Sequence, residues 1–301
     1  MSNIQFHCDY YVVMEDGIVK ETHLPNHVCF ENNCLKATNK EPVQLQMVYQ
    51  LTSHAHMEVS YEIEARCQID IIETKIFEDG AQFEKAVKIG NDAIVHIFSE
   101  NDCQNKETIT CHEDVYLQSQ AHCQCGYAEL SDGSYDGSYH YYLDGEGAEV
   151  TLRMAALSQN KDHKHYEVLI CHNQPHTYGQ MDNYGVVKDG GQLIIDGVGT
   201  ITKGQTGSAS HQTNKIMVFD ENCIASANPF LYIDEYDVQA SHAAGVGKMD
   251  ENHLYYLQSR GLTKKQAMQL ITYGYLKPVV DVINNPMMKE QFEIALSKVG
   301  A

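Results

Sequence analysis

Basic residues are scarce in this sequence and are not gathered into runs. Its 301 residues include 21 Lys and Arg against 41 Asp and Glu, which gives a formal net charge of −20 with neutral His. Proteins that bind nucleic acid or anionic membranes carry a basic patch that contacts phosphate groups. The composition therefore excludes both as main partners.

Long apolar runs are also missing. No segment is long enough to span a bilayer, and Asp9, Glu15 and Asp16 interrupt the region where a secretion signal would need an apolar stretch. We therefore expect a cytoplasmic protein. In that compartment the 10 cysteines would be reduced thiols used for packing or for metal binding. The 16 histidines strengthen the metal interpretation.

Two catalytic signatures are absent. The chain has no Gly-x-x-x-x-Gly-Lys-Ser/Thr loop, so it is not expected to hydrolyse ATP itself. No Ser or Cys lies in a recognisable nucleophile motif. The sequence therefore predicts a protein that is not an enzyme, and any energy from ATP would come from a partner.

Short runs with period-two alternation fill the chain up to about Ser241, as in Val43–Tyr49 and Gly191–Ile201. Such runs, separated by Gly, Asn and Asp, indicate β-strands. Helical periodicity is weak here, with one possible exception around Ala81–Ala86. The Gly/Ser/Asp-rich Leu130–Tyr139 is interpreted as a loop that divides an irregular first part from a more regular second part. The pattern alone does not choose between a sandwich, a jelly roll and a β-helix.

After His242 the pattern becomes helical. Capping residues and apolar spacing predict three helices: Glu251–Arg260 after Asp250 and before Gly261, Lys264–Tyr273 after Thr263, and one from near Pro286 toward Val299. We therefore expect a β domain over residues 1–245 and a helical subdomain over residues 246–301.

Six short motifs occur in an order that resembles the SufB/SufD family. They are Val168–His172 with His176, Gly197–Gln205, Asn214–Val218, Asn228–Asp234, Ser241–Gly247, and Ser259–Gly261 followed by Gln266 and Ala267. The resemblance is clearest from His165 to Leu276 and begins loosely at Leu143. It implies a right-handed parallel β-helix followed by C-terminal helices, and a scaffold role in iron–sulfur cluster assembly. The chain resembles a short SufB-like form without the extended N-terminal helical region of many members.

The resemblance also implies a pair of cluster ligands. When the sequence is aligned to the SufB pattern at Pro229 and counted in both directions without a gap, Cys223 and His242 fall on the cysteine and histidine positions of SufB. Thiolate and imidazole suit a transient iron–sulfur cluster of the 4Fe–4S type. The alternative is a buried hydrophobic Cys223 and a turn residue at His242.

A Cys/His pair does not complete a cluster. A second protomer or the nearby acids would supply further ligands; those acids are Asp220, Glu221 and Asp237. SufB has a glutamate directly after the histidine, whereas this chain has Ala243. The chain would otherwise be a SufD-like structural partner that holds no cluster.

Three further cysteines, Cys123, Cys125 and Cys171, are candidates for sulfur handling. Cys123 and Cys125 would face one side of a strand with His122 opposite, and Cys111 lies upstream with His112. The pair is either a sulfur or zinc site or ordinary packing. Cys171 lies on a path that carries sulfur inward, as the resemblance implies, or it belongs to the core. We prefer the core interpretation for Cys171.

The resemblance implies a partner as well. A SufC-like ABC ATPase would dock on the helices, and the matching residues are Tyr255, Tyr256, Arg260, Gly261, Ala267, Leu270 and Ile271. The other interpretation is a helical cap over the end of the β-helix, and such a cap could also carry the docking surface. We expect a homodimer through the end near Pro229–His242, or a heterodimer with a paralogue. A different class stays open: an unrelated β-helix or sandwich module whose acidic surface binds a cation or a carbohydrate.

Overall fold

Two parallel sheets, wound from a single chain, make up most of the molecule. The computed structural model describes residues 6–103, 105–281 and 285–299. Sheet A has ten strands in the order β19-β17-β15-β13-β11-β9-β7-β5-β1-β2, and sheet B has nine in the order β18-β16-β14-β12-β10-β8-β6-β4-β3. Within the described residues, no helix is both long and apolar enough to cross a membrane.

The strand bounds are as follows. They are β1 (Tyr10–Glu15), β2 (Ile18–His23), β3 (Val28–Glu31), β4 (Cys34–Ala37), β5 (Val43–Leu51), β6 (His56–Ile63), β7 (Gln68–Phe77), β8 (Gln82–Ile89), β9 (Ile94–Asn101), β10 (Ile109–Leu117), β11 (His122–Glu129), β12 (Tyr135–Leu143), β13 (Glu149–Ser158), β14 (His163–His172), β15 (Tyr178–Val187), β16 (Gln192–Ile201), β17 (Ala209–Val218), β18 (Ile224–Ile233) and β19 (Gln239–Lys248).

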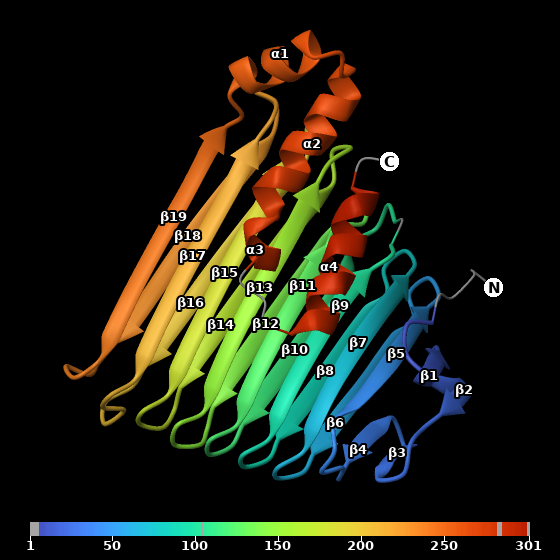
Figure 1. The fold of residues 1–301 in the computed structure, drawn as a ribbon, viewed down its shortest axis with the longest axis vertical. Helices are drawn as coiled ribbons and strands as arrows, with labels where there is room; N and C mark the ends of the chain where they lie inside the picture. The colour runs from blue at the N-terminus through green and yellow to red at the C-terminus, as the bar shows by residue number, and fades with distance from the viewer. Residues whose placement is uncertain (1–5, 104, 282–284, 300–301) are drawn as a thin grey trace.

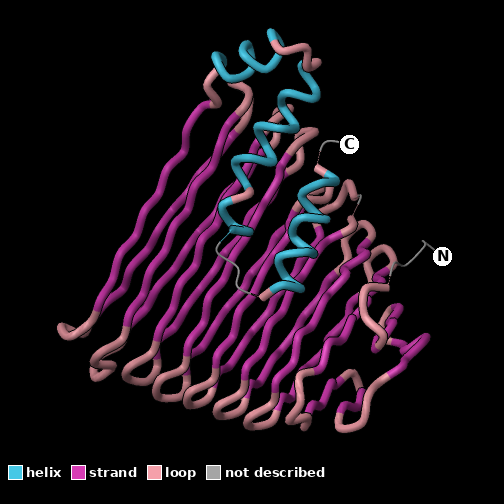
Figure 2. The backbone as a smooth tube through the Cα atoms, in the orientation of Figure 1, coloured by secondary structure: helices cyan, strands magenta, loops and turns pink. Residues whose placement is uncertain are grey.

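From β5 onward the chain alternates between the two sheets, so each coil gives one strand to each sheet. Strands pair in parallel with those one coil away, as in Gln68 with Ile94 and Gln192 with Ile224. Figure 2 shows the turns of successive coils stacked in a row. This arrangement is a parallel β-solenoid, so the predicted parallel β-helix with C-terminal helices is confirmed.

Strict alternation explains why these segments stay in the coil. Along β16 the side chains of Leu193 and Ile195 are buried in the lumen between the sheets, while Gln192 and Ile194 are partly exposed outside. Successive residues of a strand point to opposite faces, so period-two sequence places one apolar row inside every coil. Stacking the coils makes these rows one continuous core.

At the N-terminal end, two antiparallel hairpins close the solenoid. β2 pairs with β1 at the edge of sheet A, and β3 pairs with β4 at the edge of sheet B. At the other end, β18 and β19 form the last coil and carry the free edges of both sheets. Every residue of β19 is exposed.

Four helices follow the last strand: α1 (Glu251–Ser259), α2 (Lys264–Leu276), α3 (Pro278–Asp281) and α4 (Pro286–Lys298). Asp250 caps α1, and Thr263 with Gln266 forms a capping box at the start of α2. A second core contains Phe98 and Ala128 of sheet A with Leu276 and Phe292 of the helices. Helices α2 to α4 therefore cover the outer face of sheet A, as Figure 1 shows, and leave the terminal coil uncovered. The alternative of a cap over the solenoid end is wrong.

Two further expectations are wrong. Residues Ala81–Ala86 are not helical, because Gln82 begins β8, whose residues pair with both β6 and β10. The segment Leu130–Tyr139 does not divide the chain, since Tyr135 already begins β12 and the coil pattern continues across it. Gly and Ser are tolerated in β12 because the neighbouring strands dictate its extended backbone.

Candidate functional site

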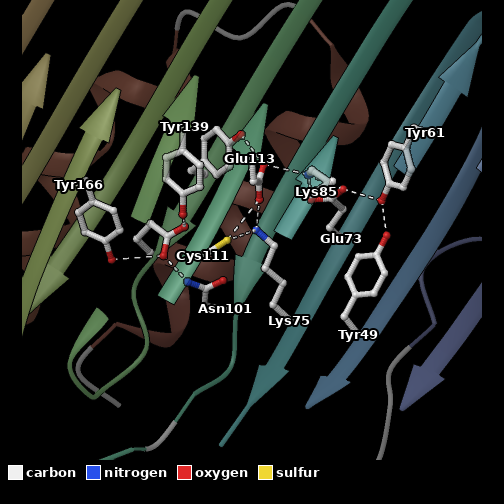
Figure 3. Close-up of polar contacts among 12 residues, drawn as sticks. Tyr49, Tyr61, Glu73, Lys75, Lys85, Asn101, Cys111, Glu113, Tyr139 and Tyr166 are labelled. Atoms are coloured by element: carbon white, nitrogen blue, oxygen red, sulfur yellow. Dashed lines mark hydrogen bonds and ion pairs between the residues drawn. The ribbon is translucent and has the colours of Figure 1, made fainter. Parts of the chain in front are cut away.

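A chain of polar side chains runs through the lumen of the solenoid (Figure 3). Lys75 forms an ion pair with Glu113, whose other oxygen lies 2.9 Å from the Lys85 Nζ atom. Lys85 also donates to both oxygens of Glu73 at 2.7 Å. These four side chains are fully or almost fully buried and come from β7, β8 and β10. Two cations and two carboxylates thus compensate one another where they are shielded from solvent.

Tyrosines extend this chain in both directions along the lumen. Tyr61 donates to Glu73 at 2.7 Å and also contacts the hydroxyl of Tyr49. On the other side Tyr127 donates to Glu113 at 2.9 Å. In a neighbouring group of the same lumen, Tyr139 and Tyr166 donate to Glu129 at 2.7 and 3.3 Å. Hydrogen bonds satisfy these buried oxygens, which would otherwise be costly to keep from water.

The charged groups keep their ionised forms through mutual contact. Burial alone would raise the pKa of Glu113, but Lys75 and Lys85 lower it to about 2. Burial would lower the pKa of Lys75, but the nearby carboxylates, Glu113 and Glu73 among them, raise it well above its ordinary value. Glu113 and Lys75 are therefore charged at neutral pH.

The predicted thiol pair lies in the same lumen. Cys123 and Cys125 are buried on β11 with their Sγ atoms 3.4 Å apart, and His122 is exposed on the opposite face, as predicted. The hydrogen bond to Cys125, together with burial, raises the pKa of Cys123 well above its ordinary value. Burial raises the pKa of Cys111 to about 12. Cys111 and Cys123 are therefore protonated at neutral pH, and a thiol is a weak nucleophile and a poor metal ligand.

Cys171 does not lie in the core, so our preferred interpretation of this residue is wrong. It occupies an outward position of β14, is partly exposed, and has its Sγ atom 2.8 Å from Thr200 Oγ1. Its neighbour His172 faces inward and is buried, with Nδ1 2.7 Å from Thr177 Oγ1. The predicted strand end and turn between His172 and His176 are confirmed.

Cys223 lies in the turn that enters β18. Its backbone N–H donates to the Asp220 carbonyl at 3.2 Å, and its side chain is partly buried against the core. Asp220 and Glu221 share this turn, and Glu221 forms an ion pair with Lys248 at 3.4 Å. These three predicted ligands are therefore near one another at the open end of the solenoid.

His242 lies in β19 and not in a turn. It pairs in register with Gln212, a buried residue whose Nε2 donates to the Phe230 carbonyl of the opposite sheet at 2.9 Å. Residues paired in register face the same side of a sheet, so His242 faces the lumen. No later coil covers it, and the residue is exposed. Ala243 takes the next position and so faces away from the lumen.

The structure does not bring Cys223 and His242 together within one chain. Gln212 places His242 level with Phe230, and Cys223 precedes Phe230 by seven residues along β18. At about 3.3 Å per residue this separation is more than about 20 Å. Asp237 lies in the turn before β19, at the other end of the coil from Cys223, where its carboxylate accepts from Thr206 Oγ1 at 2.6 Å.

The predicted docking residues form an exposed surface on α1 and α2. Tyr255 is 75% exposed and Leu270 is 50% exposed. Arg260 stacks on the ring of Tyr256, with Cζ 5.1 Å from its centroid. An open groove of 430 Å³ lies beside them, lined by residues that include Tyr256, Leu257, Leu270, Ile271 and Met217. Ala267 is fully buried, so it supports this surface from beneath and does not contact a partner itself.

The family model for the SUF system FeS cluster assembly, SufBD core domain, matches residues 46–275. The chain belongs to the SufBD family. The match begins in β5 and ends in α2, so it includes the lumen network, the terminal coil and the exposed surface of the helices. Membership rules out the unrelated β-helix or sandwich module that the sequence left open.

Curated relatives of the SufBD chain agree with this assignment. It is 33% identical over 162 residues to the iron–sulfur cluster assembly protein SufD of Bacillus subtilis. This match covers 54% of the chain and 37% of the relative. It is 26% identical over 136 residues to SufB of the same organism, covering 45% of the chain and 29% of the relative. The chain is 23% identical over 158 residues to SufD of Escherichia coli, a match that covers 52% of the chain and 37% of the relative. The SufBD chain thus matches less than two fifths of the length of these relatives.

Sequence reasoning missed the charged lumen network, although a signal was present. Glu73 and Lys75 occupy the same inward alternation as Ile69 and Ile71 on β7. A charge on the apolar side of a period-two run indicates a buried partner, because a lone buried charge is very costly. The partner of Lys75 is Glu113, and only the coil stacking identifies it.

Proposed function

We propose that this protein is a scaffold for iron–sulfur cluster assembly that works as a homodimer with an ABC-type ATPase of the SufC kind. Family membership and the relatives, which are iron–sulfur cluster assembly proteins, support the assembly role. The observation that carries the proposal is the terminal coil, where two free sheet edges and a lumen-facing His242 are left uncovered.

A second copy is the natural cover for this end. The edges of β18 and β19 present unpaired backbone N–H and C=O groups, which favour pairing with another strand. Exposed apolar side chains accompany them, including Ile224, Phe230, Tyr232 and Val246. A two-fold axis would cover the surface of both copies at once. A heterodimer with a paralogue would use the same edges.

Such a dimer would also bring Cys223 of one subunit closer to His242 of the other. A two-fold axis perpendicular to the sheets reverses the strand direction of the second copy. Cys223 of the partner subunit then moves from one end of the coil toward the level of His242. The proposed cluster is therefore shared between protomers, with Asp220 or Glu221 beside each Cys223. A cluster held across an interface can be released when one subunit moves.

The ligand types suit a transiently held cluster, proposed to be of the 4Fe–4S type. A thiolate is a strong soft ligand, and an imidazole nitrogen is a more weakly held one. Ala243 faces away from the lumen, so a glutamate at this position would point away from the face that carries His242. The SufD-like alternative, in which the chain holds no cluster, remains the second candidate because SufD is among the relatives.

Two further parts of the proposal concern sulfur and ATP. Cys123, Cys125 and Cys171 are the proposed sulfur-handling residues: the first two form a buried pair in the lumen, and Cys171 is partly exposed on the outer face of β14. The helical surface around Tyr255, Tyr256 and Leu270 is the proposed ATPase contact. The scaffold itself is proposed to be a cytoplasmic protein that is not an enzyme.

Intersubunit complementation tests the shared site. Cys223→Ser and His242→Ala are each reconstituted anaerobically with iron and sulfide. Cys223→Ser should lose most cluster absorbance, and His242→Ala should lose less, because imidazole is the more weakly held ligand. When the two variants are mixed and allowed to exchange subunits, each heterodimer regains one site with Cys223 from one copy and His242 from the other. Cys29→Ser, an exposed cysteine near the N-terminal end, is the control and should reconstitute normally.

Each result has a defined meaning. Loss in both single variants without recovery on mixing would contradict a shared site. Normal reconstitution of both single variants would support the SufD-like role. Pro at Leu231 in the edge strand β18 should yield monomers by light scattering, and a monomeric wild-type protein at micromolar concentration would end the dimer proposal.

A further inference from the structure

A separate group of metal-ligand side chains lies on the outer face of sheet B, away from the terminal coil. His112 and Asp114 alternate on β10 and therefore share a face, and His140 of β12 pairs in register with Asp114. The three residues offer ligand atoms that all lie within 4.8 Å of one another. Because two neighbouring strands of a paired sheet hold them, their backbone positions are fixed in advance.

The distances suit a small divalent ion. His112 Nε2 lies 3.3 Å from Asp114 Oδ2, and His140 Nδ1 lies 3.6 Å from Asp114 Oδ1. Zinc binds His nitrogen and carboxylate oxygen at about 2.0–2.2 Å, which places tetrahedral ligands about 3.3 Å apart. Only small side-chain rotations separate the three groups from that geometry.

One oxygen atom within the group lacks a donor. Asp114 Oδ1 is buried and, among the residues that the structure describes, accepts no hydrogen bond. It lies 3.6 Å from His140 Nδ1, and the Nε2 atom of the same ring lies 2.7 Å from Glu167 Oε1. A buried acceptor without a donor is costly, and a cation between Asp114 and His140 would satisfy it. A carboxylate behind a histidine is also the arrangement that orients metal-binding imidazoles.

The group has an open side. A pocket of 310 Å³ is lined by His112 and Asp114 together with Glu84 and Ser60. Three protein ligands with space for a further one are typical of metal sites that exchange ligands, whereas closed four-ligand sites are structural.

We propose that His112, Asp114 and His140 bind one divalent transition-metal ion of the zinc or ferrous iron class, with a free position toward this pocket. Nitrogen and carboxylate ligands favour these ions over copper(I), which prefers sulfur. The group His56, Glu58 and Glu84 lies on the same face, but all three residues are exposed and only one is a histidine. It carries no proposal. The inference is independent of the proposed cluster function, because His242 lies on β19 and Cys223 lies in the turn before β18.

Cobalt(II) is the probe, because its visible absorption distinguishes nitrogen and oxygen ligands from the thiolates of the ten cysteines. The wild-type chain should bind one more Co²⁺ without thiolate absorption than the double variant His112→Ala/His140→Ala. Zn²⁺ titration calorimetry should show the same difference. Glu167→Gln should weaken the affinity about 10–100-fold, since it removes the group that orients His140.

His165→Ala is the matched control. His165 lies on the same face of sheet B between Asp136 and Asp196, at 3.1 and 3.0 Å, with no second histidine in the group. Its removal should leave the cobalt signal unchanged. Asp114→Asn gives a second test that keeps the side-chain shape. If the double variant, confirmed as folded by circular dichroism, binds as many Co²⁺ and Zn²⁺ ions as the wild type, the site does not exist.

Discussion

Lys85 and Glu73 face each other inside the solenoid, with the Lys85 Nζ atom 2.7 Å from both carboxylate oxygens of Glu73. Lys85 also contacts Glu113, which holds Lys75 on its other side. Each carboxylate therefore compensates a buried cation, and none of the four can be removed without leaving a charge unpaired. The stability of the lumen therefore depends on all four of these side chains being present together.

Glu113→Gln should destabilise the protein strongly. The substitution leaves Lys75 and Lys85 with one carboxylate between them, and breaking a buried ion pair costs about 3–5 kcal/mol. Urea unfolding measures the change in the free energy of unfolding. Glu62→Gln, which breaks an exposed ion pair with Lys36 at 2.9 Å, is the control and should have little effect. Equal effects of the two variants would contradict the buried-pair argument.

His172 should make stability depend on pH. Burial, with a smaller effect of His211, lowers its pKa from 6.5 to about 4. As the pH falls, His172 therefore takes up a proton in the unfolded chain at a higher pH than in the folded chain. The stability that neutral His172 contributes is complete above about pH 6.5 and is lost between about pH 6.5 and 4. The shift corresponds to about 3 kcal/mol. In His172→Gln the unfolding free energy should fall less over this window, whereas the exposed His163→Gln should behave like the wild type.

Gly126→Ala should disturb the docking of α4. A methyl group at this position would lie 2.4 Å from a ring carbon of Phe292 and 3.0 Å from the end of Met288. Phe292 is buried against Phe98, so it has little room to move, and overpacking of this kind costs about 1–3 kcal/mol. Thermal unfolding and proteolysis of the C-terminal helices measure the effect. Gly245→Ala, where a methyl group meets nothing within 4 Å, is the control and should remain as resistant as the wild type.

Tyr256→Ala combined with Leu270→Ala should reduce co-purification with a SufC-like ATPase without unfolding the chain. Both residues are largely exposed beside the groove on α1 and α2, and truncating apolar anchors weakens an interface most. Deleting the helices would be a poorer test, because it would uncover the second core beneath them. Gln258→Ala, an exposed change on α1, serves as the control. Unchanged binding by the double variant would place the ATPase contact elsewhere.

The sequence by itself determined the local structure. Alternation in Gly191–Ile201 predicted β16, because a strand with one buried face must repeat every two residues. Asp250 and Thr263 predicted the starts of α1 and α2, because their side chains satisfy backbone N–H groups within a few residues. These interactions are short in sequence, so a linear pattern contains them.

Only the tertiary structure decided which distant residues meet. Lys75 pairs with Glu113, and Asp114 lies opposite His140, because coils of unequal length stack in one particular register. The same stacking put Cys223 and His242 at different levels of the terminal coil, although their spacing around Pro229 matched the family pattern. It also placed the helices on sheet A instead of the open end, since the apolar outer row of Phe98 and Ala128 needed cover. Such choices follow from the packing of whole coils, and no short segment of sequence contains them.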